Sequence, residues 1–260
     1  MTDTLAASVA AIAAEAGKLA IERWQTDFKR WEKAPGNPVC EIDLALDAML
    51  RERLTALLPD AGWLSEESVD NPERLKAERI WVVDPIDGTR DYLRGRPGWA
   101  VSIALVERGQ PVIGVLDAPA RREVWCAEAG KGAWRNGKAI RTGSRELLAG
   151  SRVPADSLPK VDQDLVMVDK PNSIALRIAM VANAEADLVA TLRWGFEWDI
   201  AAAVLIAREA GASLSDAFGD ALHFNTPSAQ AYGVLASVPG IHAQAVERLA
   251  ERARAGVGRE

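Results

Sequence analysis

The stretch Ile80-Trp81-Val82-Val83-Asp84-Pro85-Ile86-Asp87-Gly88-Thr89 joins an apolar run to two carboxylates, a proline and a glycine-threonine pair. Its apolar half, residues 80–83, is bounded by a turn signal, a pattern typical of a strand that is buried on both faces. Pro85 has no backbone N–H to contribute to strand pairing and is expected to end this strand. Asp84 and Asp87 are therefore predicted to lie at a strand end.

The residues after the carboxylates have the character of a helix start. Gly88 and Thr89 would open the next element with backbone N–H groups that have no partner inside the helix. Such groups bind anions, and carboxylate oxygens bind hard divalent cations. The stretch thus indicates a site in which metal ions hold a phosphate.

Spacing separates this pattern from two other motifs. Enzymes that form an aspartyl-phosphate carry Asp-x-Asp, whereas two residues separate Asp84 from Asp87. A calcium EF-hand loop that began at Asp84 would have Ile86 at its third position and Thr89 at its sixth, where an oxygen ligand and a glycine are needed. A structural interpretation, in which Asp87 caps the following helix, stays open but leaves Asp84 without a role.

Composition indicates a globular chain with a large core. The 260 residues are 48% hydrophobic and 26% charged, without low-complexity runs, which excludes extensive disorder. A net charge of −6 argues against stable binding of nucleic acid, which depends on neutralising phosphates. No apolar run reaches membrane-spanning length, and the start Met1-Thr2-Asp3-Thr4 lacks the basic region of a secretory signal, so a cytoplasmic location is expected.

Cysteine and histidine offer no second chemistry. Cys40 and Cys126 are far apart and lack metal-ligand spacing, so free thiols are expected. His223 and His242 are isolated from any nucleophile motif and are predicted to have structural or surface roles.

The periodicity predicts two differently built halves, with a boundary near residue 143. The first, residues 1–142, is predicted to hold helices at 5–30 and 43–58, a loop at 34–38 and strands at 63–67 and 80–83. Strands at 99–107, 111–117 and 123–128 are predicted to form an antiparallel meander, followed by a hairpin turn at Asn136-Gly137. The second, residues 143–260, is predicted to alternate strands at 165–168, 187–190, 212–215 and 232–237 with helices at 173–183, 198–210 and 241–254. The two halves are expected to pack together with the site between them.

Two further acidic points match the chemistry of the opening stretch. Glu66 and Glu67 end a predicted strand, although a solvated loop would also explain them. Glu197 and Asp199 flank Trp198 at a predicted helix start, where an acid also serves as a cap. Each point alone is ambiguous.

Taken in order, the motifs resemble a known family. Glu66-Glu67, then Asp-Pro-Ile-Asp-Gly-Thr at 84–89, then Trp198-Asp199 followed by an Ala-rich helix and Glu209-Ala210-Gly211, are similar to the motifs of the inositol monophosphatase superfamily. The resemblance covers essentially the whole chain. It implies an α/β (α+β) fold of the αβαβα layered sandwich type and a Mg²⁺-dependent phosphomonoesterase that acts through metal-activated water, without a covalent intermediate.

The resemblance also implies roles for individual residues. It places metal ligands for two or three Mg²⁺ ions at Glu66, Asp84, the carbonyl of Ile86, Asp87 and Asp199, with Asp84 bridging two ions and most ligands in the first half. It assigns catalysis to Asp43, Glu66 and Thr89, with Thr89 acting on the water and Asp43 supporting it, and substrate binding to Asp87, Gly88, Thr89, Arg177, Glu197 and Asp199. Cys40 stands where relatives usually carry Thr before the acidic pair that contains Asp43, and Asp47 is an alternative exposed helix acid.

The flanking segments are closest to those of bacterial 3′(2′),5′-bisphosphate nucleotidases. Ser173-Ile174-Ala175-Leu176-Arg177 resembles their Ser-Ile-Ala-Tyr-Lys segment, and Arg177 is suited to a second, unreacted phosphate. Two departures fall where the leaving group should lie: Asn172 replaces a usual glycine, and 193–196 replaces a usual Gly-Pro-Thr. Trp194 and Phe196, within that second departure, are predicted to be core residues, with stacking on a base as the alternative.

The substrate is therefore expected to be a small phosphorylated molecule. A nucleotide bisphosphate, 3′-phosphoadenosine 5′-phosphate, is the preferred interpretation, and an inositol or other sugar monophosphate is the alternative. A regulatory or interaction protein with a vestigial site is a further alternative, against which the intact acidic set argues. Relatives also suggest a homodimer.

Overall fold

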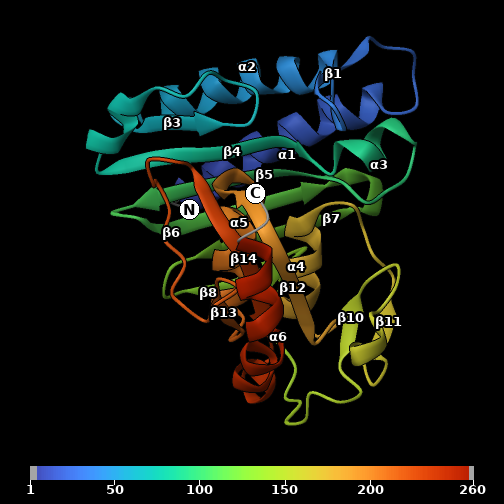
Figure 1. The fold of residues 1–260 in the computed structure, drawn as a ribbon. Helices are drawn as coiled ribbons and strands as arrows, with labels where there is room; N and C mark the ends of the chain where they lie inside the picture. Colours follow the sequence, from blue (N-terminus) through green and yellow to red (C-terminus); the bar gives the residue numbers. More distant parts are fainter. Residues whose placement is uncertain (1–4, 258–260) are drawn as a thin grey trace.

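Helices and sheets alternate in layers in the computed structural model, which describes residues 5–257 (Figure 1). Helices α1 (Leu5–Arg23) and α2 (Glu41–Leu57) cover one face of a seven-stranded sheet. Helices α4 (Ile174–Ala182) and α5 (Glu197–Glu209) lie between this sheet and a three-stranded sheet, and α6 (His242–Val257) covers the far side. The expected αβαβα sandwich is confirmed.

The large sheet follows chain order. Its strands are β3 (Gly62–Ser65), β4 (Arg79–Asp87), β5 (Ala100–Glu107), β6 (Gln110–Ala118), β7 (Glu123–Glu128), β8 (Gly132–Arg135) and β9 (Lys138–Ala139). Only the pairing of β3 with β4 is parallel, so β4 to β9 form an antiparallel meander, of which the sequence predicted the part from β5 to β7. The turn at Asn136-Gly137 joins β8 to β9, with positive φ values of 50° and 73° that suit these two residues.

Strand β4 does not end at Pro85, contrary to the sequence-based expectation. Asp84 pairs with Ser102 and Asp87 with Ala100, so β4 carries one residue more than β5 between these pairs. This β-bulge accommodates a proline that a regular ladder would exclude. The strand thereby continues through Asp87, and the bulge separates the two carboxylates.

The first helix is shorter than predicted. It ends at Arg23, and Gln25 adopts a positive φ of 62° that a helix cannot include. The segment predicted as the end of this helix and the following loop instead forms a hairpin of β1 (Arg30–Ala34) and β2 (Asn37–Cys40), which turns at 35–36. The Ala-rich composition favoured a longer helix. The backbones of residues 30–34 and 37–40 are instead paired with each other across the hairpin.

The second half contains the predicted alternation, in which the strands predicted at 187–190 and 232–237 are longer than expected. The three-stranded antiparallel sheet has the order β12 (Leu188–Phe196), β14 (Gln230–Ser237), β13 (Ser213–Ser215). A separate parallel pair joins β10 (Arg152–Pro154), which the sequence did not predict, to β11 (Val166–Val168). Short helical segments are α3 (Thr89–Leu93) and single turns at Pro72–Lys76, Pro119–Arg121, Lys160–Asp162 and Pro239–Ile241.

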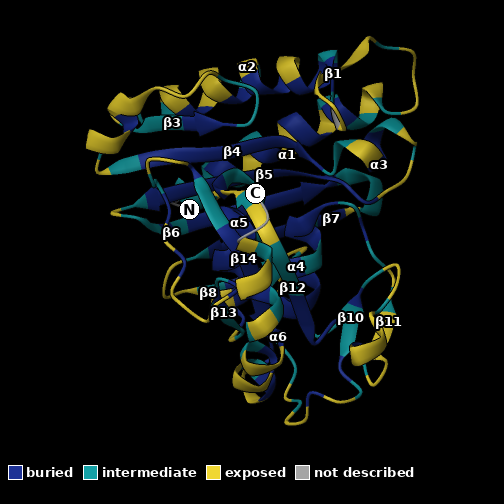
Figure 2. Ribbon diagram, in the orientation of Figure 1, coloured by how far each residue is buried: buried dark blue, intermediate teal, exposed yellow. Residues whose placement is uncertain are grey.

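Close packing of α5 on the large sheet joins the two halves. A Cβ at Gly114 of β6 would lie only 2.6 Å from the carbonyl oxygen of Ala202 in α5. Small side chains on both elements therefore allow the helix to approach the sheet, and Figure 2 shows both buried. The two-domain division at residue 143 stays a prediction. Within residues 5–257, no helix combines the length and apolarity needed to cross a membrane.

Asp117 is a buried carboxyl without a counter-ion. It is 5% exposed on β6, and a Cβ at Gly17 of α1 would lie 1.9 Å from its Oδ2 atom, so α1 packs directly on it. No hydrogen bond or ion pair to this carboxyl occurs in the described part of the chain. Burial raises the pKa of Asp117 to about 6.

We expect Asp117→Asn to stabilise the protein at neutral pH. A carboxyl whose folded pKa lies above its unfolded value contributes most to stability at low pH, and that contribution is lost as the pH rises through 6. An uncharged amide at this position would remove the loss, worth up to about 3 kcal/mol at neutral pH for a pKa raised from 3.8 to about 6. Urea unfolding across the acid to neutral range measures it. The control Asp27→Asn, at an exposed position, should leave the pH dependence unchanged; a wild-type slope in the Asp117 variant would contradict the prediction.

Candidate active site

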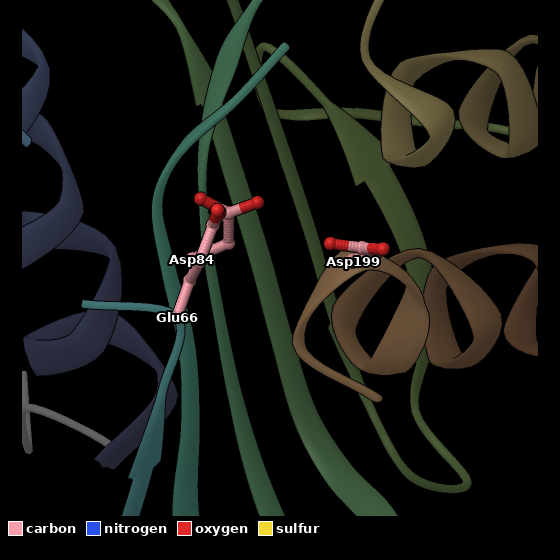
Figure 3. A group of neighbouring side chains, drawn as sticks. All are labelled: Glu66, Asp84 and Asp199. Carbon is pink, nitrogen blue, oxygen red and sulfur yellow. The ribbon is translucent and has the colours of Figure 1, made fainter. Parts of the chain in front are cut away.

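Three carboxylates from three elements converge beside the end of β4. Glu66 follows β3, Asp84 lies in β4, and Asp199 lies in the first turn of α5 (Figure 3). One oxygen atom from each lies within 4.8 Å of the others. The side chains of Glu66 and Asp84 lie together on the strands, and Asp199 faces them from the helix.

Strand pairing places the first two carboxylates together. Because β3 and β4 are parallel, with Ser65 opposite Val83, the residues that follow, Glu66 and Asp84, lie at the same end. The backbone N–H of Glu66 donates to the carbonyl of Val83 at 3.3 Å. Asp47 of α2 accepts hydrogen bonds from Ser65 and Ser68, at 2.5 and 2.6 Å, on either side of Glu66. Asp47 is thus a buried anchor of this turn and not an exposed helix acid.

The carboxylates of the cluster repel one another, and burial disfavours their charged forms. Burial raises the pKa of Asp84 well above its usual range, and the charges of Glu66, Asp87, Asp199 and Asp43 raise it further. Burial likewise raises the pKa of Asp199, with Asp87 and Glu66 adding to the effect. Carboxylates that destabilise one another in this way are stabilised by a cation placed among them.

Asp87 connects the large sheet to α4. Its Oδ2 atom accepts from the Ser173 hydroxyl at 2.5 Å and from the backbone N–H of Ala175 at 2.8 Å. Burial raises the pKa of Asp87 to about 6, while these hydrogen bonds oppose the shift. The alternative that Asp87 caps the next helix along the chain is wrong, because residue 88 is the N-cap of that helix, α3. Asp87 instead accepts hydrogen bonds at the start of α4.

Gly88 sits where no side chain fits. Its φ is 94°, and a Cβ there would lie 2.7 Å from the carbonyl oxygen of Gly98 and 2.8 Å from the backbone nitrogen of Ser173. The start of α4 is held against this turn by a second contact, in which Asp91 accepts from the backbone N–H of Asn172 at 3.1 Å. Asp91 was not singled out from the sequence, because its partner lies 81 residues away.

The predicted catalytic side chains lie on both sides of the turn. The Thr89 hydroxyl donates to the carbonyl of Ile86 at 3.0 Å, so the predicted water-activating group and the predicted metal-binding carbonyl are adjacent. Asp43 accepts from the backbone N–H and the thiol of Cys40, at 2.8 and 2.9 Å. Within residues 5–257 no hydrogen bond joins Asp43 to Thr89, so the support predicted for Thr89 stays a prediction.

Cys40 serves as a donor to the start of α2. Burial raises the pKa of the Cys40 thiol to about 12, so the thiol keeps its proton and donates a hydrogen bond to Asp43. Burial in turn raises the pKa of Asp43 to about 6, against the effect of these hydrogen bonds. Cys40 and Cys126 are both free thiols, as predicted.

A lysine that the sequence did not single out contacts the cluster. Lys33, in β1, lies with its Nζ atom 3.0 Å from Glu66 and 2.8 Å from Glu67. Burial raises the pKa of Glu67 to about 7, and the hydrogen bond from Lys33 opposes that shift. Only the hairpin of β1 and β2, which was predicted as a helix end and a loop, brings Lys33 to this position.

Arg177 lies on α4 close to the cluster. Its guanidinium donates to the carbonyls of Ser173 and Asn172, at 3.2 and 2.6 Å. Burial lowers its pKa, and the charge of Asp87 opposes that shift. No carboxylate in the described residues forms an ion pair with Arg177. Its charge therefore remains available to an anion, consistent with the substrate-binding role predicted for it.

Glu197 does not face the cluster. It is 0% exposed, and both carboxylate oxygens accept hydrogen bonds: from the backbone N–H of Asn225 at 2.6 Å, and from the N–H and hydroxyl of Thr226 at 2.9 and 2.6 Å. This placement argues against the predicted substrate-binding role. Glu197 instead anchors the segment that precedes β14 to the start of α5.

Trp194 and Phe196 correct a second expectation. They are 38% and 39% exposed and so are not core residues. The two histidines have the expected roles: His242 bridges Ser237 and Ser215, at 2.9 and 3.2 Å, and His223 is exposed.

The donor set fits a hard divalent cation. All three converging side chains offer carboxylate oxygens, which Mg²⁺ and similar ions prefer, and none offers sulfur or imidazole. Burial, followed by the charges of neighbouring carboxylates, raises the pKa of Asp84 and of Asp199, so a cation placed among these groups would favour their charged forms. Glu66, Asp84 and Asp199 are therefore suited to hold a metal, with Asp87 adjacent.

Comparisons with known proteins agree with this geometry. A family model described as the inositol monophosphatase family matches residues 1–256. A fructose-1,6-bisphosphatase/inositol-1-monophosphatase of Thermotoga maritima is 33% identical over 189 residues, 70% of this chain and 72% of the relative. The 3′(2′),5′-bisphosphate nucleotidase CysQ of Escherichia coli is 32% identical over 201 residues, 74% of this chain and 81% of that protein.

A solved structure extends the agreement to the fold. Thermotoga maritima IMPase superposes with a TM-score of 0.82 at 28% identity, over 95% of this chain and 97% of that one. The relatives carry different activity names, so they agree on the chemistry and not on the substrate. From its convergent carboxylates, its layered fold and its match along almost the whole sequence, the chain belongs to the inositol monophosphatase family and is a metal-dependent phosphomonoester hydrolase.

Proposed function

We propose that this protein is a Mg²⁺-dependent 3′(2′),5′-bisphosphate nucleotidase that converts 3′-phosphoadenosine 5′-phosphate and water to AMP and phosphate. The observation that carries the proposal is Arg177, a cation without a carboxylate partner among the described residues, beside a carboxylate cluster suited to metal. A reacting phosphate needs the cluster, and a second phosphate on the same substrate needs a separate cation. The similarity to CysQ supports the same assignment.

An inositol-1-phosphatase or sugar phosphatase is the second candidate. The Thermotoga maritima relative, whose name includes inositol-1-monophosphatase, favours it. A monophosphate, however, leaves Arg177 without a role in substrate binding. The cytoplasmic location, the homodimer and the number of ions, two or three, stay predictions from the sequence.

The chain's own residues divide the work around the phosphate. Bound Mg²⁺ would supply positive charge to the phosphoryl oxygens and lower the pKa of the attacking water. Asp84 is oriented for this by the backbone N–H of Ile86, which donates to its Oδ1 atom at 2.9 Å. The first N–H groups of α3, at Gly88 and Thr89, have no intrahelical acceptor and would donate to phosphate oxygens.

Thr89 is suited to orient the water. Its hydroxyl proton is donated to the carbonyl of Ile86, which leaves the oxygen lone pairs to accept a proton of the attacking water. Glu66 would hold metal beside the same water. No covalent bond to the protein is required, because the water oxygen forms the new bond to phosphorus while the P–O ester bond breaks, and the leaving ester oxygen takes up the proton that the water loses.

We expect Asp84→Asn to lower the activity of the protein while raising the stability of its metal-free form. We expect turnover to fall by at least about 10³-fold, because a shared metal ligand is lost. The metal-free protein should be more stable than wild type, since removing one of several repelling buried carboxylates relieves the repulsion. Phosphate release with Mg²⁺ and thermal unfolding in EDTA measure the two effects.

Asp117→Asn, which changes a buried carboxyl away from the cluster, is the matched control and should keep wild-type turnover. If Asp84→Asn retains wild-type activity, the ligand assignment is wrong.

Substrate choice is tested directly. With Mg²⁺ present, we expect 3′-phosphoadenosine 5′-phosphate to be hydrolysed with a kcat/KM at least about tenfold above that of inositol 1-phosphate, because only the nucleotide offers Arg177 a second phosphate. Phosphate release at matched substrate concentrations measures both. The reverse order would favour the sugar phosphatase. Hydrolysis of neither compound, by protein whose melting temperature rises with Mg²⁺, would reject both candidates.

A further inference from the structure

Asp199 belongs to a helix that lies far along the chain from the two strands next to Glu66 and Asp84. The parallel pairing of β3 with β4 fixes the spacing of Glu66 and Asp84. Asp199 faces these two carboxylates from the first turn of α5 (Figure 3). Buried carboxylates that repel one another keep such a separation only where the surrounding structure restrains them. The restraint on Asp199 must therefore come from contacts of α5 with the rest of the molecule.

A buried arginine close to the turn of Glu66 supplies one such contact. Arg74 is 3% exposed and lies in the helical turn Pro72–Lys76, which follows that turn in the sequence. Its Nε and Nη2 atoms donate to the two carboxylate oxygens of Asp70, at 2.6 and 3.0 Å. A bidentate pair of this kind fixes the plane of the guanidinium. Arg74 is thereby anchored to the segment that follows Glu66.

The same guanidinium contacts the segment that precedes β14. Its Nη1 atom donates to the side-chain oxygen of Asn225 at 2.7 Å, and its Nη2 atom donates to the carbonyl of Thr226 at 3.0 Å. The side-chain amide of Asn225 donates in return to the carbonyl of Arg74 at 3.2 Å. Asn225 adopts a positive φ of 59°, which asparagine tolerates better than most residues. These contacts join residues that lie 151 positions apart.

Asn225 and Thr226 in turn hold the first residue of α5. The backbone N–H groups of both residues and the Thr226 hydroxyl donate to the buried carboxylate of Glu197. The backbone N–H of Glu197 donates to the carbonyl of Ala229 at 2.9 Å. Glu197 is therefore fixed through its side chain and its backbone. Asp199 follows two residues later in the same helical turn, so its position depends on how Glu197 is held.

Arg74 also favours the charged form of Glu197. Burial raises the pKa of Glu197, and the hydrogen bonds from Thr226 and Asn225, followed by the charge of Arg74, oppose that shift. Among the described residues Arg74 forms its ion pair with Asp70 and none with Glu197. Arg74 therefore acts on α5 through Asn225 and Thr226.

We propose that Arg74 is a positioning residue that sets the distance of Asp199 from Glu66 and Asp84, and thereby the affinity of the cluster for Mg²⁺. The hydrogen bonds run from Asp70 through Arg74 to the segment that holds Glu197, and none of them involves an oxygen of a clustered carboxylate. Mg²⁺ tolerates little departure from octahedral geometry, so a small displacement of one ligand weakens binding. This inference rests on the proposed Mg²⁺ site and holds for either candidate substrate.

Calorimetric titration of EDTA-treated protein with Mg²⁺ tests this role without turnover. We expect Arg74→Met to weaken Mg²⁺ binding at least about tenfold, because residues that orient metal ligands commonly contribute about 10–100-fold to affinity. Asp70→Ala removes only the anchor of Arg74, at a side chain that is 42% exposed, and so preserves the buried contacts. It should weaken Mg²⁺ binding at least about threefold.

The Mg²⁺ dependence of phosphate release gives a second readout. Arg74→Met should need at least about tenfold more Mg²⁺ for half-maximal rate, with kcat at saturating Mg²⁺ within about threefold of wild type, because every ligand is retained. A merely structural role would lower the melting temperature without changing the Mg²⁺ requirement.

Arg135→Met is the matched control. Arg135 forms ion pairs with Glu123 and Glu185, at 2.5 and 2.6 Å, and lies in β8, which three strands separate from β4. This variant should therefore keep the wild-type Mg²⁺ affinity and the wild-type Mg²⁺ requirement.

The outcomes separate this inference from the proposed function. Wild-type Mg²⁺ affinity in folded Arg74→Met or, should that variant not fold, in Asp70→Ala would overturn the inference and leave the proposed function intact. Equal weakening in Arg135→Met would also overturn it, because the effect would not be specific to Arg74. Absence of Mg²⁺ binding to the wild-type protein would overturn the proposed function and this inference with it. Weaker binding in the Arg74 and Asp70 variants alone supports the inference.

Discussion

Mutual repulsion among carboxylates at the end of β4 is the constraint around which this molecule is arranged. Asp84, Asp87 and Asp199 are held close to one another and to Glu66 in a region where burial penalises charge. Their neighbours are groups that favour negative charge: the start of α4 at Asp87, the ammonium of Lys33 and the guanidinium of Arg177. These groups offset the repulsion only partly, and a bound metal ion would supply further positive charge.

The packing of the core fixes the geometry of this cluster. Glu66 and Asp84 come from adjacent strands and would be close in any parallel pairing of this register. Asp199 arrives from a helix 115 residues beyond Asp84 in the sequence, and its position depends on how closely α5 packs on β6 at Gly114. A bulkier residue at that contact would push the helix away, so stability and catalysis share the same small-residue interface.

The carboxylate cluster and the exposed segment beside it are held in place in different ways. The metal-binding set lies in segments held by strand pairing and by buried hydrogen bonds, as Asp47 and Asp91 illustrate. The segment 193–196 lies instead on a bulged strand end with exposed side chains. The backbone N–H of Phe196 donates to Asp199 at 3.3 Å, so this exposed segment is tied directly to one of the three clustered carboxylates.

Local patterns in the sequence determined the buried strand at 80–83, the antiparallel meander, the Asn136-Gly137 turn and the donor chemistry of the site, because periodicity and residue type act over short distances. The long first helix, the end of β4 at Pro85 and the core placement of Trp194 and Phe196 were wrong, because hairpin pairing, a β-bulge and tertiary packing leave no mark on local periodicity. The hydrogen bonds of Glu197 argue against the substrate-binding role predicted for it. Only the tertiary structure decided that Asp87 binds the start of α4, that Lys33 contacts Glu66, and that Glu197 accepts hydrogen bonds from Thr226. The physical reason is that residue type defines what a side chain can bind, whereas packing defines which partner it meets.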